Sequence, residues 1–397
     1  MRRTLALLGG ALAIAACADP VQPPSAPVRA AAQLTAPDVF ARYVALGTSN
    51  SQGAQSGGIS AATQRAAWPA QLAARVGVPF SLPLVQDPGC SPPLLPPLAA
   101  DLVLVGAFGS DVVTAVMTTC APLRAGITLP TNSVAISGAN VHDALYRTPQ
   151  AAMAFSTRVG TLYSRVLPPG KTQVTAMLAQ RPTFVSVELA ANEVLPASTG
   201  RISAMTPYAD WQRDYDGVLA AVKSTGARAV LVGLPNNAAN FPSIRRAREF
   251  FNEWPDLLAF RVSVSFNCYF SSNYVFVPGY VLSLIQKAPT TATCADVPGA
   301  VDYVLTSSDV SAINARMAQM NAHIQAKATE NGYAYFSLAT VYDLPKINFD
   351  LTSVLFSSAP FGPNMSLDGV HPSARGQGLL AAAAAQAINA RYGLAIP

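Results

Sequence analysis

Charged residues and histidines are scarce in this sequence. Only 12% of the 397 residues are charged, about half the usual fraction, whereas 51% are hydrophobic. The chain can therefore bury a large core, and its composition is not that of a disordered protein. A net charge of +5, scattered along the chain, argues against a nucleic-acid partner. Three isolated histidines and the lack of any Cys-x-x-Cys spacing argue against a metal site.

Long apolar runs are also missing beyond the leader, where none approaches the ~20 residues that a membrane span needs. The leader itself has the form of a secretory signal, with Arg2 and Arg3 before a short apolar stretch that ends in Ile14-Ala15-Ala16-Cys17. This ending resembles the bacterial lipoprotein motif, which implies a signal peptide over residues 1–16 and a lipid anchor on Cys17. Ala18 resembles the outer-membrane sorting pattern, on the periplasmic or the surface face. The alternative is an ordinary signal cut after an alanine, with Cys17 uninvolved.

Residues 17–37 are rich in proline and alanine and are expected to form a tether rather than a folded element. After them, apolar runs and helical spacing alternate, which indicates a single α/β domain over residues 38–397 with a mostly parallel sheet. The expected strands are residues 40–46, 133–136, 183–189, 228–234 and 333–338, and the expected helices are residues 62–76, 207–224, 309–331 and 373–392.

The alternation breaks at about residues 236–305, which we interpret as an insertion. Its segment 241–293 is dense in aromatic residues and holds Cys268 and Cys294. Either these aromatics form a wall or lid of a substrate cleft, or they pack on one another as a satellite core. Both interpretations remain open at this stage.

Polar residues with catalytic chemistry follow several of the expected strands. Ser49 comes after Gly47 at the end of the first strand, and Asn192 comes just past the strand at 183–189. Near the C-terminus, Asp368 and His371 stand three residues apart in a loop. A serine nucleophile needs such a base with a carboxylate to orient it, and an amide can donate to a developing oxyanion.

Four ordered blocks resemble those of the SGNH or GDSL esterases and lipases. They are Gly47-Thr48-Ser49, the segment 133–138 ending in Gly138, Ala190-Ala191-Asn192-Glu193, and Asp368-Gly369-Val370-His371. The resemblance implies a three-layer α/β/α sandwich of the flavodoxin-like type, a Ser49, Asp368, His371 triad, and an oxyanion hole from the N–H groups of Ser49 and Gly138 and the amide of Asn192. Thr48, Ala190 and Glu193 stand where the family usually has Asp, Gly and Asp.

The resemblance implies a serine esterase or lipase that needs no cofactor, works as a monomer, and acts on a small-molecule, lipid or acylated-glycan ester. An α/β-hydrolase elbow fits less well, because the second glycine of that motif is absent around Ser49. The alternative from another class is a surface lipoprotein that keeps the fold as a binding module and has lost turnover.

The four cysteines after Cys17 suit disulfides in an exported protein. Three pairings exist, and we favour Cys90–Cys120 and Cys268–Cys294 because each pair brackets one irregular segment. Of the other histidines, His142 is expected to be an ordinary residue near a helix start rather than a substrate contact, and His323 a residue on the edge of a helix.

Overall fold

Four parallel strands form the central sheet in the computed structural model, in the order β1-β2-β3-β9. Their bounds are β1 Tyr43–Gly47, β2 Phe184–Glu188, β3 Arg228–Gly233 and β9 Ala334–Ser337. The structure describes residues 35–98 and 120–397, which belong to the unit Thr35–Pro397. The expected signal peptide, Cys17 and most of the tether lie outside the described residues.

The predicted strand at residues 133–136 pairs with the free edge of β1 without forming a named strand. Ala45 N–H donates to the Asn132 carbonyl at 2.9 Å, and the Val134 and Ile136 N–H groups donate to β1 carbonyls at 2.9 and 3.1 Å. This pairing is parallel, as in the rest of the sheet. The other four strands lie within one to three residues of their predicted bounds.

Alternate residues of the strands enter two separate cores, one on each face of the sheet. Tyr43, Phe184 and Phe336 pack on one face, whereas Val44, Val185 and Leu231 pack on the other. Because both faces are covered, β1 and β2 are buried at every position, and β1 is a continuous apolar run in the sequence. The predicted α/β sandwich is confirmed.

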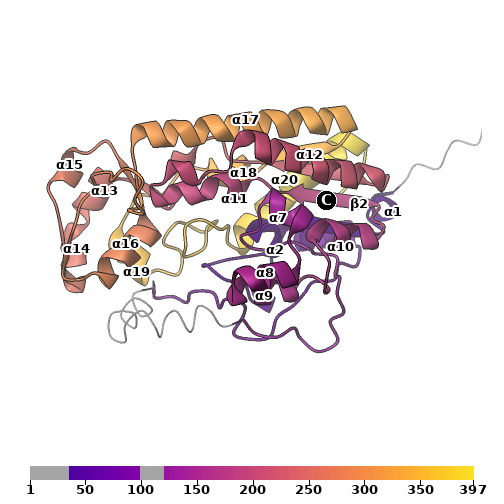
Figure 1. Ribbon diagram of the computed structural model, residues 1–397, viewed down its shortest axis with the longest axis horizontal. Coiled ribbons are helices and arrows are strands. Elements are labelled where there is room, and N and C mark those ends of the chain that lie inside the picture. Colours follow the sequence, from indigo (N-terminus) through magenta and orange to yellow (C-terminus); the bar gives the residue numbers. More distant parts are fainter. Residues whose placement is uncertain (1–34, 99–119) are drawn as a thin grey trace, which may run out of the picture. The chain divides into compact units, whose positions relative to one another are not determined.

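Two sets of helices cover these faces. One face carries α4 Trp68–Val76 and α20 Ala374–Tyr392. The other carries α7 Val141–Tyr146, α10 Gln173–Ala179, α12 Tyr208–Ser224 and α17 Ser307–Asn331. In Figure 1, α12 and α17 lie side by side along the sheet. The long α17 begins at a capping box between Thr306 and Asp309 and ends at Gly332, as its sequence predicts.

The single helix predicted over residues 62–76 is wrong. The segment divides into α3 Ala61–Arg65 and α4 Trp68–Val76. Pro69 is the physical reason, because a proline lacks the N–H that an interior helix position needs and is tolerated in the first turn of a new helix.

The remaining helices are short. They are α1 Ala36–Val39, α2 Ser49–Gln52, α8 Pro149–Phe155, α9 Thr157–Ser164, α11 Ala191–Val194, α18 Ala339–Tyr342 and α19 Leu351–Phe356, with 3-10 turns η1 Leu195–Thr199, η2 Ile202–Ala204 and η3 Ala238–Asn240. Within residues 35–98 and 120–397, no helix combines the length and hydropathy needed to cross a membrane.

The insertion at about residues 236–305, which contains the aromatic-rich segment, forms its own small sheets. Strands β4 Ile244–Arg246, β6 Tyr274–Phe276 and β8 Val304–Leu305 are antiparallel, and β5 Val262–Val264 pairs with β7 Thr290–Ala292. Helices α13 Ala247–Asn252, α14 Trp254–Leu257, α15 Asn267–Phe270 and α16 Val277–Gln286, with the 3-10 turn η4 Leu258–Phe260, gather at the end of the unit away from α1 (Figure 1).

Both favoured disulfides are present, Cys90–Cys120 and Cys268–Cys294. The second lies within the aromatic-rich segment, where both of its cysteines are fully buried. Most of the irregular segment that the first one brackets, residues 99–119, lies outside the described residues.

Candidate active site

Ser49 is the first residue of α2, directly after the turn that follows β1. Position 47 has no room for a side chain, so a glycine is required there. A Cβ at this position would lie 2.5 Å from the Ser51 hydroxyl and 3.1 Å from the Glu188 carboxylate. The missing side chain lets the turn pack against β2, and this packing presents Ser49 at the carboxyl edge of the sheet. Ser49 is 9% exposed, and that exposure opens into a cavity.

Glu188, the last residue of β2, accepts hydrogen bonds from the residues around Ser49. Its Oε1 accepts from the Thr48 hydroxyl at 2.7 Å, and its Oε2 accepts from Thr48 N–H at 3.0 Å. The same Oε2 accepts from the N–H of Ser51 at 3.2 Å and from its hydroxyl at 2.9 Å. Burial raises the pKa of Glu188, and these four hydrogen bonds oppose the rise. Thr48, where the family usually has Asp, therefore serves as a donor to a carboxylate on the neighbouring strand.

Glu188 is not among the site residues predicted from the sequence. One signal was available: Glu188 is the only charged residue of the strand predicted at 183–189, and a carboxylate that is buried in a sheet needs hydrogen-bond donors. The donors that bond to Glu188 depend on the register of β1 against β2, in which Gly47 lies beside Glu188. The sequence of β2 alone does not determine that register.

Asp368 and His371 form a hydrogen-bonded pair in the loop before α20. His371 Nδ1 lies 2.7 Å from Asp368 Oδ2. Asp368 Oδ1 also accepts from the N–H groups of Val370 at 2.9 Å and His371 at 2.8 Å. Burial alone would raise the pKa of Asp368, but the charge of His371 and these hydrogen bonds hold that pKa below its ordinary value.

An ionised Asp368 only accepts hydrogen bonds, so it fixes the proton of His371 on Nδ1 and leaves Nε2 as the acceptor. Burial alone would lower the pKa of His371, but the negative charge and the hydrogen bond of Asp368 raise it above its ordinary value. The pair thus has the electrostatics of a general base with its orienting carboxylate.

The loop after α2 connects the segment that holds Asp368 and His371 to the segment that holds Ser49. Gly57 N–H donates to Asp368 Oδ2 at 2.7 Å. Ser56 N–H donates to the Ser366 hydroxyl at 2.9 Å, and Leu367 N–H donates to the Ser56 hydroxyl at 3.3 Å. Segments more than 300 residues apart in sequence are therefore clamped to each other beside Ser49.

Asn192, on α11, points its amide toward the segment after residues 133–136. Its Nδ2 donates to the Ala139 carbonyl at 2.7 Å, which leaves its second N–H for another acceptor. Ala190, where the family usually has Gly, precedes α11 with a φ of −172°. This angle lies outside the left-handed region, so the backbone at this position does not require a glycine.

Gly138 does need its glycine, because its φ is +78°. The neighbouring Ser137 N–H donates to the Gln52 Oε1 of α2 at 2.7 Å, which couples this turn to the nucleophile's helix. Gly138 is exposed and lines a different cavity from Ser49. The structure thus brings Ser49, Asn192 and His371 to one cavity and leaves Gly138 just outside it.

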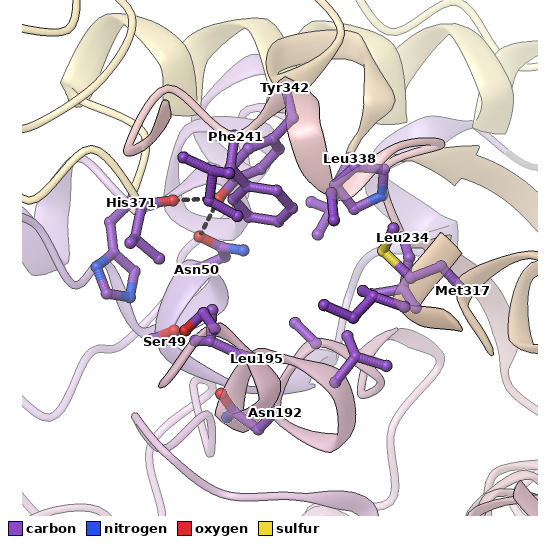
Figure 2. Close-up of a pocket in the computed structure, with 18 of the residues that line it drawn as sticks. Ser49, Asn50, Asn192, Leu195, Leu234, Phe241, Met317, Leu338, Tyr342 and His371 are labelled. Carbon is purple, nitrogen blue, oxygen red and sulfur yellow. Dashed lines mark hydrogen bonds between the residues drawn. The ribbon is translucent and has the colours of Figure 1, made fainter. Parts of the chain in front are cut away.

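An apolar cavity opens beside Ser49 (Figure 2). Ser49 lies between the His371 imidazole and the Asn192 side chain on one side of it, and hydrophobic side chains surround the rest. These come from η1, the segment after β3, α17 and the segment after β9, and include Leu195, Leu234, Met317, Leu338 and Tyr342. The aromatic-rich segment adds Phe241, Ile244 and Phe276.

Most aromatics of that segment pack elsewhere. Phe251, Phe266, Tyr269 and Phe270 form a cluster of edge-to-face and stacked rings. The segment therefore does both things that its composition allows: a few residues line the cavity and the others form a satellite cluster.

Glu193, where the family usually has Asp, is buried beside the start of α7, which follows the turn at 137–139. Its Oε1 accepts from Val141 N–H, the first residue of α7, at 2.6 Å. Burial raises the pKa of Glu193 to about 7, and the nearby Asp143 and Glu188 carboxylates add to the rise. Its longer side chain thus anchors the start of α7.

The two remaining histidines each lie at hydrogen-bond distance from an aspartate, and neither lines the cavity beside Ser49. His142 Nδ1 lies 2.9 Å from Asp214 Oδ2, and His323 Nε2 lies 2.8 Å from Asp216 Oδ1. Among the described residues, no group of three or more His, Cys, Asp or Glu side chains is arranged to hold a metal ion.

A family model described as GDSL-like lipase/acylhydrolase matches residues 43–384. Comparison with curated proteins gives no sequence match. Similar solved structures include phospholipase A1 from Streptomyces albidoflavus, at 16% identity and a TM-score of 0.36, covering 88% of this chain and 98% of that one. An extracellular lipase from Streptomyces rimosus has 15% identity and a TM-score of 0.34, with 86% and 98% covered. A mutant acetyl-xylooligosaccharide esterase from Geobacillus stearothermophilus has 12% identity and a TM-score of 0.33, with 89% and 94% covered.

Proposed function

Because the chain belongs to the GDSL-like lipase/acylhydrolase family of ester hydrolases, we propose that it is a serine esterase or lipase that uses Ser49, Asp368 and His371. The observation that carries the proposal is geometric. Ser49, Asn192 and His371 line one cavity, and the 2.7 Å contact of His371 with a buried carboxylate leaves its other nitrogen free to accept a proton.

In the proposed mechanism, His371 Nε2 takes the proton of the Ser49 hydroxyl as its oxygen attacks the ester carbonyl. Negative charge on the carbonyl oxygen is stabilised by the free N–H of Asn192 and by the N–H groups of Ser49 and Gly138. His371 then gives the proton to the departing alcohol, and the acyl group stays on Ser49. Water, deprotonated by His371, attacks the acyl-enzyme and releases the acid.

The apolar cavity is the proposed site of the acyl group. Its wall is mostly hydrocarbon and aromatic, and among the described residues that line it only His371 and the Tyr342 phenol are ionisable. Each methylene of an acyl chain that is buried there contributes about 0.8 kcal/mol, so chain length should control the rate. Phe241, Ile244 and Phe276 make the aromatic-rich segment part of this wall.

Hydrolysis of carboxylic esters of increasing acyl length tests the proposal. The wild type should hydrolyse them and Ser49→Ala should not, while both proteins unfold at similar denaturant concentrations. Phe276→Ala should change the ratio of rates on long and short acyl esters, whereas Phe270→Ala, at a 75% exposed ring of the satellite cluster, should leave it constant. Full activity in Ser49→Ala would end the proposal, and wild-type inactivity with every ester would favour the binding-module alternative.

We also propose that the protein is exported, acylated at Cys17 and held at the outer membrane through residues 17–37. The support is the sequence motif Ile14-Ala15-Ala16-Cys17. Labelled palmitate should enter the wild type, and Cys17→Ser should release the protein into the soluble fraction. A Cys17→Ser variant that stays at the membrane would contradict the anchor.

A further inference from the structure

A second cavity lies at the turn formed by residues 137–139, on the side away from the apolar cavity. Its volume of about 360 Å³ is in the range of small-molecule sites. We call it the arginine-lined cavity, because Arg147 and Arg158 line it together with Gly57, Ser137 and Gly138.

Hydrogen bonds join two walls of the arginine-lined cavity to the segments that carry candidate catalytic residues. Gly57, in one wall, donates its N–H to Asp368. Ser137, in the other wall, donates to Gln52 of the helix that begins at Ser49. An ester carbonyl held at Ser49 and Gly138 would therefore lie between the apolar cavity and the arginine-lined one.

The two cavities differ in charge. Arg158 Nη2 donates to the Ser91 hydroxyl at 3.1 Å, and its side chain is exposed. Arg147 pairs with Asp143 at 2.8 Å and lies over the Phe155 ring at 5.2 Å, which orients it. Among the described residues that line this cavity there are two guanidinium groups and one carboxylate, a net charge of +1. A hydrocarbon chain suits the apolar cavity, and an anion suits this one.

From this asymmetry we infer that the arginine-lined cavity receives the alcohol portion of the ester, and that this portion carries an anionic group, a phosphate or a carboxylate. The inference rests on the proposed function, because it concerns which ester Ser49 cleaves. Arg158 binds the anion, and Arg147 contributes its charge from a fixed position. The acyl group enters the apolar cavity, so the bond that breaks lies between the two.

The test compares three esters with one acyl group: the butyryl esters of glycerol, of glycerol 3-phosphate and of glycerate. The wild type should show a kcat/KM about tenfold or more higher for an anionic ester than for the glycerol ester, the effect of one charge-assisted hydrogen bond. Whether the phosphate or the carboxylate ester is faster identifies the anion. Arg158→Gln should reduce this preference about tenfold, and Arg158→Lys should keep most of it.

Arg201→Gln is the matched control, because it removes the same charge at an exposed residue that does not line the cavity. It should leave all three rates at wild-type values. Equal rates on neutral and anionic esters in the wild type would overturn the inference, and so would equal losses in Arg158→Gln and Arg201→Gln. Those results leave ester hydrolysis intact, whereas a wild type that cleaves no ester would refute the proposed function, and the inference with it.

Discussion

Replacing Glu188 by alanine should release the nucleophile loop from the sheet. The carboxylate accepts four hydrogen bonds, two from Thr48 and two from Ser51, and these residues flank the candidate nucleophile on both sides. Both donor residues are buried, so water cannot replace the lost acceptor without entering the core. The substitution therefore tests whether this carboxylate positions Ser49.

The size of the effect follows from the donors. The two hydroxyls can rotate toward other acceptors, but the N–H groups of Thr48 and Ser51 cannot. Each buried N–H left without a partner costs about 1–3 kcal/mol, so Glu188→Ala should lower the free energy of unfolding by about 2–6 kcal/mol. Displacement of Ser49 by about 1 Å should lower kcat about 100-fold.

Glu188→Gln is the matched variant. Its amide oxygen can occupy the Oε2 position and keep both N–H donors, while its NH2 donates to the Thr48 hydroxyl, which reverses its role. Loss of charge-assisted hydrogen bonding is offset by removal of a buried charge, so the free energy of unfolding should change by about 1 kcal/mol or less.

Urea unfolding at pH 7 and kcat on a short acyl ester measure both effects for the two variants. We expect a large loss of stability and turnover in Glu188→Ala and only small losses of both in Glu188→Gln. Equal losses in the two variants would mean that the charge, not the hydrogen bonding, matters. Wild-type turnover in a folded Glu188→Ala would refute the positioning role.

Three further predictions concern the neighbouring groups. His371 must be neutral to act as a base, and Asp368 raises its pKa, so kcat/KM should rise with pH around a midpoint above 6.5. Asp368→Asn should move that midpoint to a lower pH and reduce kcat. A midpoint that does not move in this variant would contradict the pairing of Asp368 with His371. The pKa of Glu193 is raised on folding from 4.5 to about 7, so the native state loses roughly 3 kcal/mol of stability as pH rises through that window. Glu193→Gln, which keeps the acceptor for Val141, should therefore gain stability over the wild type at pH 8 and little at pH 4, and a gain independent of pH in urea unfolding would count against this pKa. Asn192→Ala should lower kcat about 10²- to 10³-fold, as loss of one oxyanion donor does, and a change below threefold in steady-state kinetics would remove Asn192 from that role.

The strands were the most predictable part of the fold. Residues buried on both faces of a parallel sheet are mostly apolar at consecutive positions, which indicates β1 and β3 in the sequence, and the alternation of apolar residues indicates β2. Capping residues located α17 in the same way. The helix predicted at residues 62–76 failed because hydrophobic spacing continued across Pro69 although the backbone could not.

Part of the candidate site was equally predictable, and part was not. Asp368 and His371 are close in sequence, so their contact depends on one loop. The bonds of Glu188 to Thr48 and Ser51, and of Gly57 to Asp368, join segments 137 to 311 residues apart and depend on strand register and loop packing. The separation of Gly138 from the apolar cavity likewise depends on how the turn at 137–139 packs, which no local pattern encodes.

Labelling with a fluorophosphonate tests the central claim most directly, because the reagent reacts with an activated serine and not with an ordinary hydroxyl. Mass mapping of the labelled full-length chain should find one adduct, on the peptide that contains Ser49. The His371→Ala variant should label far more slowly, and Ser49→Ala should not label at all. A folded wild type that takes up no reagent, or that carries the adduct on another serine, would contradict the account.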